Sequence, residues 1–159
     1  MAHCLTVADW MSAMNGAASE VATTALGFSG CQIVRNHTAI PAGHEGAYMA
    51  LIGQDESVQL GLLSTPRGCQ ALAKALLQMA PEDEDLGPPD LADAVCEVTN
   101  IITGGVKTRV NGRGASLALG LPIFVGGAVR LTNHQVLAVA EVLIGDVPAA
   151  LVLIEPRAA

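Results

Sequence analysis

Apolar residues recur every three or four positions in three segments of the chain, which is the spacing of one face of an α-helix. The first segment, residues 7–26, predicts a helix that Gly27 ends as a left-handed residue. The second begins at Thr65-Pro66, an N-cap followed by a first-turn proline, and runs to about Met79. Asp90 introduces the third helix, also a long one, expected over residues 91–110.

Shorter apolar runs bounded by turn residues predict β-strands. The most apolar stretch, residues 136–154, is about as long as a membrane span. It contains Glu141, Asp146 and Pro148, however, and Gly145-Asp146 is a turn signal, so we predict a β-hairpin there. The predicted strands are residues 32–36, 47–52, 58–63, 115–119, 123–131, 136–143 and 149–155.

Composition favours one α+β domain over residues 1–159. Apolar residues make up 51% of the 159 residues and aromatic residues only 3%, so the core must consist of aliphatic side chains, which suits helices on a sheet. The net charge of −7 argues against binding to nucleic acid or to an anionic membrane surface. The four cysteines form no CxxC pair, and no secretory signal opens the chain, so we expect reduced thiols and a cytoplasmic protein.

The two halves of the chain are similar to each other. The segment from Glu20 to Gly27 aligns with the segment from Glu97 to Gly104. In each half the helix is followed by strands that include a hairpin. We therefore predict two pseudo-repeats, about residues 7–64 and 90–155, that share one core, with two long helices side by side on the sheet.

The third helix carries an unusual polar face. At about 100° per residue, Asp93, Glu97, Asn100 and Gly104 fall within about 60° of one another, opposite the apolar core stripe. Gly104 and Gly105 inside a helix should each cost about 1 kcal/mol relative to alanine. Nothing local explains that cost, whereas a missing side chain beside Asn100 would let another protein approach closely.

The polar and charged residues of this region also have simpler interpretations. Glu97 and Asn100 could be ordinary solvated residues. Lys107, Arg109 and Arg113 could contact a phosphate group, or could interact with the dipole at the helix C-terminus. The acidic run at residues 82–85 could be a docking patch, although a solvated loop is the more usual meaning of such a run.

Other candidate groups offer little chemistry. The four histidines lack metal-ligand spacing, so we predict no metal site. Cys96 has no evident base to activate it and is expected to be a packed thiol. Gly112-Arg113-Gly114 lacks the rest of a phosphate-binding loop and is expected to be a turn.

The pattern Asp93-x3-Glu97-x2-Asn100-x3-Gly104 followed by Pro122 resembles the signature of the CheC/CheX/FliY chemotaxis phosphatases. That signature is Asp or Ser, x3, Glu, x2, Asn, and a proline about two dozen residues later. A single copy in a chain of this length is most similar to CheX. Two departures exist: the gap to Pro122 is one residue shorter than usual, and Thr23 stands in the first half where the motif would have asparagine.

The resemblance implies a CheC-like fold, with two long helices on a mixed, largely antiparallel sheet, and a phosphatase that hydrolyses the aspartyl phosphate of a CheY-like response regulator. It implies that Glu97 and Asn100 are catalytic and that Asp93 and Gly104, with Lys107, contact the partner. Mg²⁺ would be held by the partner's receiver domain and not by this chain. Members of the CheX type are typically homodimers, so a homodimer is expected on this ground alone.

Two other functions remain open. The chain could be a non-catalytic adaptor in a sensory or flagellar-switch complex, since the FliM middle domain is similar in fold without the intact motif. It could also be a small-ligand sensor that uses the glycine-rich segment from Gly120 to Gly127, although no specific residue supports this.

Overall fold

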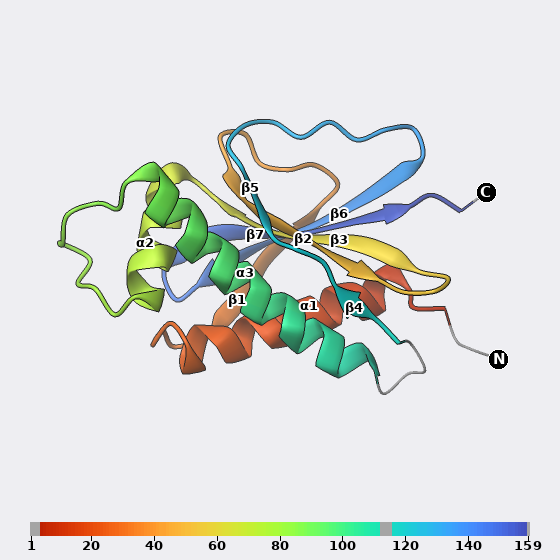
Figure 1. Ribbon diagram of the computed structural model, residues 1–159, viewed down its shortest axis with the longest axis horizontal. Helices are drawn as coiled ribbons and strands as arrows, with labels where there is room; N and C mark the ends of the chain where they lie inside the picture. The colour runs from red at the N-terminus through yellow and green to blue at the C-terminus, as the bar shows by residue number, and fades with distance from the viewer. Residues whose placement is uncertain (1–3, 112–115, 159) are drawn as a thin grey trace.

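An antiparallel sheet with helices on one face forms the structure, a computed structural model that describes residues 4–111 and 116–158 (Figure 1). The strand order is β1-β6-β7-β3-β2-β4, and β5 also pairs with β2. Every pairing is antiparallel. The predicted α+β class is confirmed. The elements are α1 (Val7–Thr24), β1 (Cys31–His37), β2 (Glu45–Ile52), β3 (Ser57–Ser64), α2 (Pro66–Leu76), α3 (Pro88–Asn111), β4 (Ala118–Leu119), β5 (Ile123–Val125), β6 (Gln135–Ile144) and β7 (Val147–Pro156).

The strand order has an internal symmetry. The first, second and third strands of the first half are β1, β2 and β3, and those of the second half are the β4–β5 segment, β6 and β7. Each strand of one half lies at the mirror position of its counterpart in the strand order. The helices α1 and α3 lie side by side on one face of this sheet and run in opposite directions (Figure 1). This arrangement is what two helix-plus-strands copies around a shared core would produce, and the duplication itself stays a prediction.

Local signals account for the helix ends, some of which differ by a few residues from the prediction. Thr6 and Asp9 form a capping box at the start of α1. At its end Gly27 is left-handed, with a φ of 68°, and the Phe28 amide donates to the Ala22 carbonyl, as in a Schellman motif. Thr65 caps α2, whose regular part ends at Leu76, three residues before the predicted end. The third helix begins at Pro88, earlier than predicted, because prolines suit the first turn of a helix.

The strand predicted over residues 123–131 is wrong in extent. Only Ile123–Val125 pairs with β2, and the pairing stops at Gly126-Gly127, where Gly127 has a φ of 135°. The chain then crosses the helix-free face of the sheet, where Val129 and Leu131 pack against the strands. Of the strand predicted over 115–119, Ala118–Leu119 pairs with β2, and residue 115 lies outside the described residues.

The predicted hairpin is confirmed. Strands β6 and β7 pair along their whole length, and Gly145, with a φ of 62°, lies in the turn between them. Within residues 4–111 and 116–158, none of the helices has the length and hydropathy needed to cross a bilayer.

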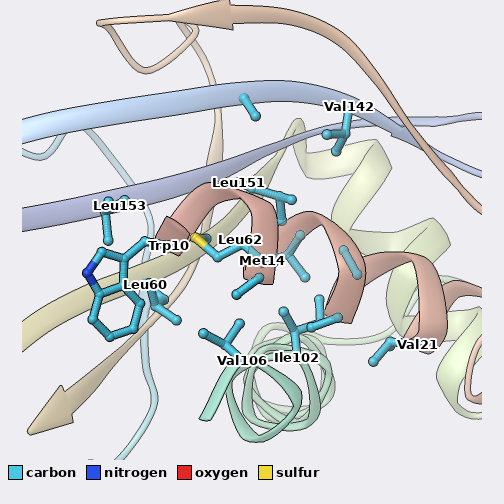
Figure 2. Packing of buried hydrophobic residues seen from close by; sticks show 14 of the residues in the cluster. Trp10, Met14, Val21, Leu60, Leu62, Ile102, Val106, Val142, Leu151 and Leu153 are labelled. Carbon is cyan, nitrogen blue, oxygen red and sulfur yellow. The ribbon is translucent and has the colours of Figure 1, made fainter. Parts of the chain in front are cut away.

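The main core lies between the sheet and the helix layer. Figure 2 shows Trp10 and Met14 of α1 among Leu60 and Leu62 of β3, with Val106 of α3 beside them. These side chains are at most 1% exposed. Burial of large apolar side chains contributes about 1.5–3 kcal/mol each, so this layer is the main source of the stability that holds α3 in place.

Helix α1 and helix α3 approach each other closely at small residues. A Cβ atom added at Gly105 would come 3.1 Å from the Ala17 Cβ. Arg109 then links the two helices, because its guanidinium donates to the Gly16 carbonyl at 3.2 Å and pairs with the Glu20 carboxylate at 2.7 Å. A contact with a distant segment of the same chain therefore explains Gly105: the position has no side chain because α1 packs there, and the approach of another protein is not needed to account for it.

The acidic run before α3 is part of a tethered loop. The Lys74 side chain is 7% exposed, and its ammonium lies 2.7 Å from Asp85 Oδ1 and donates at 2.7 Å to the Asp83 carbonyl. Asp83 in turn accepts from the Ala80 amide. Two of the four acidic residues are thus engaged within the chain, which favours the loop interpretation over the docking patch.

An ion cluster joins the edge strand β1 to β6. The Glu141 carboxylate lies 3.0 Å from Arg35 Nη2 and 3.1 Å from His37 Nε2. Desolvation would raise the pKa of Glu141, but the hydrogen bonds from Arg35 and His37 outweigh it and hold that pKa below its ordinary value of 4.5.

We expect Gly105→Leu to destabilise the protein by about 1–3 kcal/mol, because the new side chain must displace α1. Urea unfolding followed by circular dichroism measures this change. Ser12→Ala, on the exposed face of α1, is the control and should leave the midpoint nearly unchanged. A Gly105→Leu variant as stable as the wild type would contradict the close helix packing.

The Glu141 cluster predicts a pH-dependent contribution to stability. Since the folded-state pKa of Glu141 is lowered, its contribution is fully present above pH 4.5 and disappears as the pH falls through the lowered pKa. Glu141→Gln should therefore melt earlier than the wild type at pH 6, and the difference should narrow below pH 4.5. A difference that is constant from pH 6 to pH 3 would contradict this interpretation.

Candidate functional site

The polar ridge predicted on the third helix lies on the outer face of α3. The opposite face is buried through Val95, Val98, Ile102 and Val106, each at most 3% exposed. The ridge consists of Asp93, Glu97, Asn100, Gly104 and Lys107.

The ridge residues are accessible to different degrees. Asp93 and Glu97 are exposed, and Asn100 and Gly104 are partly exposed. Glu97 and Asn100 are three residues apart, so their side chains lie on neighbouring turns of one face. Among the described residues, neither has a hydrogen-bond or ion-pair partner, so both polar groups are available to another molecule.

Gly104 differs from Gly105 in its surroundings. A Cβ atom added at Gly104 would meet nothing within 4 Å. Packing within the chain therefore does not explain this glycine. It leaves a shallow gap one turn beyond Asn100, in agreement with the expected approach of another protein.

Lys107 continues the ridge. At about 100° per residue it lies about 20° from Asn100 around the helix axis, two turns along, and its side chain is partly exposed. Arg109 points instead toward α1 and is engaged there. Of the two described basic candidates, only Lys107 is on the ridge; Arg113 and the Gly112-Arg113-Gly114 turn lie outside the described residues.

The first half of the chain has no equivalent pair. Glu20, which aligns with Glu97, is ion-paired with Arg109. Thr23, which aligns with Asn100, donates its hydroxyl back to the Glu20 carbonyl at 3.0 Å. A free carboxylate beside a free carboxamide is therefore present on α3 and not at the aligned positions of α1.

Cys96 is next to Glu97 in the sequence but belongs to the packing. It is partly buried against a cluster that includes Phe124 of β5. Desolvation and the nearby Asp93 carboxylate raise the pKa of Cys96, so the thiol stays protonated and is a poor nucleophile. The expectation of a packed thiol is confirmed.

The ridge lies outside the two cavities found among the described residues. These cavities, of about 970 and 640 Å³, are lined by residues that do not belong to the ridge. In the part of the chain that the structure describes, no three His, Cys, Asp or Glu residues come together as metal ligands. The ridge is convex, so its ligand must itself supply the concave surface.

One feature beside the ridge could not be read from the sequence. Between Tyr48 and Leu51 the strand β2 advances three residues, while the segment paired with it advances four, from Leu119 to Ile123. The edge segment therefore contains a bulge, and Pro122, which lacks an N–H group, suits such a position.

The fold and the ridge together define a CheC-like protein with a single motif-bearing helix. The chain belongs to the CheX family: the family model described as "Chemotaxis phosphatase CheX" matches residues 47–141, which include the entire ridge. No curated protein sequence matches the chain.

Solved structures of low sequence identity share the fold. The chemotaxis protein CheX from Vibrio vulnificus is 14% identical, with a TM-score of 0.74 over 92% of this chain and 98% of that one. A CheX–CheY–BeF₃–Mg²⁺ complex from Borrelia burgdorferi matches at 19% identity and a TM-score of 0.70, over 94% and 98%. FliM in a FliM–SpeE complex from H. pylori matches at 11% identity and a TM-score of 0.64, over 96% and 90%.

The two adjacent glycines should respond oppositely to substitution. Gly104→Ala should stabilise the protein by up to about 1 kcal/mol, because alanine is the better helix former and nothing opposes its methyl group. The same methyl group should hinder a protein that approaches Asn100, so binding of a receiver domain to this face should weaken. Ser12→Ala on α1 is the control for binding, which it should leave unchanged. A Gly104→Ala variant that binds as tightly as the wild type would show that the gap is not used.

Proposed function

We propose that this protein removes the phosphoryl group from the aspartate of a CheY-like response regulator. The observation that carries the proposal is the pair of free side chains, Glu97 and Asn100, on one accessible helix face. Membership in a family described as chemotaxis phosphatases supports it. A related CheX has been solved with CheY, BeF₃ and Mg²⁺, and BeF₃ mimics a phosphoryl group.

The chemistry requires little from the phosphatase itself. A water molecule attacks phosphorus in line with the aspartyl oxygen, the new P–O bond forms as the old one breaks, and inorganic phosphate and a free carboxylate result. The receiver domain supplies Mg²⁺ and a lysine, so the missing contribution is a positioned water. The Asn100 carboxamide can accept a hydrogen bond from this water and donate one to the phosphoryl group.

Glu97 has a different role in the proposal. Its carboxylate pairs with a cation on the receiver, such as the active-site lysine. This charge-assisted contact orients the two proteins. Asp93 and Lys107 lie at the two ends of the ridge and contact the partner's rim. The chain needs no metal or cofactor of its own in this scheme, and the cytoplasm is the expected place of action.

The homodimer expected from the family resemblance belongs to the same proposal. Edge strand β1 has one free side, and Ile33 and Val34 on it are 43% and 60% exposed. Such an edge is available for pairing with a second copy.

Asn100→Ala tests the catalytic proposal. Loss of the group that positions the water should lower the rate above the regulator's own decay by at least about 100-fold. The measurement is the loss of label from a ³²P-phosphorylated receiver domain with and without the protein. Thr23→Ala, at the aligned position of α1, is the matched control and should keep full activity.

The same experiment separates the enzyme from an adaptor. If the wild type and Asn100→Ala both leave the decay unchanged while both still bind the receiver, the protein is a non-catalytic binding module. The structural likeness to FliM keeps this second function in view. Glu97→Gln should mainly weaken binding, seen as a raised KM.

A further inference from the structure

The most exposed large apolar side chain in the described residues lies beside the ridge. Leu121 is 87% exposed, and its neighbours Ile123 and Leu119 are 59% and 39% exposed. All three belong to the β4–β5 segment at the sheet edge that pairs with β2. Leu119 pairs with Leu51, which packs under the helices, whereas Ile123 pairs with Tyr48, which faces the helix-free side of the sheet. Ile123 therefore points away from α3, and we call Leu119 and Leu121 the edge patch.

The edge patch adjoins α3. Helix α3 contacts β5, and Phe124 of β5 packs in the same cluster as Val95 and Cys96 of α3. Figure 1 shows β5 passing beside α3, in agreement with the contact between these two elements. The segment that carries the edge patch therefore borders α3 on this side.

The bulge explains why Leu121 is outside the sheet. One extra residue in the edge segment interrupts the ladder between Leu119 and Ile123, and the Gly120 amide already donates to the Ala50 carbonyl at 2.8 Å. A bulge at a sheet edge turns a side chain away from the pleat and is frequent next to functional sites. Among the described residues, Leu121 belongs to none of the hydrophobic clusters.

The ridge alone is too small for a specific protein contact. Between Asp93 and Lys107 it is about 21 Å long and about 10 Å wide, roughly 200 Å². A specific complex buries about 800 Å² on each partner. A specific contact must therefore bury further surface beside the ridge. The edge patch supplies apolar surface there.

We infer that the edge patch is the apolar part of the surface that docks the receiver domain, with Leu121 as the main anchor. This rests on the proposed function, since the occupant is the same receiver whose phosphoaspartate reaches Asn100. The ridge contributes charge and the water-positioning amide, and Leu121 enters an apolar depression on the receiver. A charged ridge beside an apolar anchor gives both orientation and affinity.

Leu121→Ser tests the inference, with Leu77→Ser as the matched control. Leu77 is 49% exposed at the C-cap of α2, outside both the edge patch and β1. The affinity for a receiver domain activated with BeF₃ and Mg²⁺ is measured by calorimetry, separately from turnover. Leu121→Ser should raise Kd about tenfold with kcat at saturation unchanged, and Leu77→Ser should change Kd less than twofold.

The outcomes distinguish the inference from the proposed function. Receiver binding without turnover would refute the phosphatase, and Leu121→Ser would still decide the role of the patch. An unchanged Kd for Leu121→Ser overturns the inference, as does a wild type that binds no activated receiver. If Leu121→Ser alters the oligomeric state in sedimentation without altering receiver affinity, the patch is a contact between copies and the inference is wrong. Equal melting temperatures of the variants verify folding.

Discussion

The contact between α1 and α3 determines which face of α3 looks outward. Gly105 lets the helices approach closely at Ala17. One turn further along α3, Arg109 binds the Gly16 carbonyl and the Glu20 carboxylate of α1. A helix rotates as a body, so fixing one of its faces fixes all of them. Glu97 and Asn100 are presented together because Val98, Ile102 and Gly105 are held on the inside.

The same contact explains the difference between the two halves. An outward carboxylate on α1 is taken up by Arg109 of α3, and the neighbouring threonine hydroxyl bonds to its own helix. The polar side chains of α1 therefore help to hold the two helices together, whereas Glu97 and Asn100 of α3 stay accessible. The aligned positions Glu20 and Glu97 thus differ in use: the first carboxylate joins the helices, and the second faces outward.

Features that depend on residues close together in the sequence could be predicted from the sequence. The N-cap at Thr65, the left-handed Gly27 and the spacing of Asp93, Glu97 and Asn100 depend on a few neighbouring residues, and the structure agrees with them. Features that depend on distant segments were missed. The role of Gly105 required knowledge of α1, the strand expected over 123–131 ended where Gly127 leaves the sheet, and the bulge before Ile123 appears only when the register with β2 is counted.

A convex site has a kinetic consequence. Enzymes that enclose their substrate depend on a lid or a tunnel to release the product, whereas the described residues build no enclosure around Glu97 and Asn100, where the proposed reaction would take place. Inorganic phosphate would leave along the receiver's own opening, and the cycle would end when the two proteins separate. The lifetime of that encounter, set by the area around the ridge, would then limit how many regulators one molecule can reset each second.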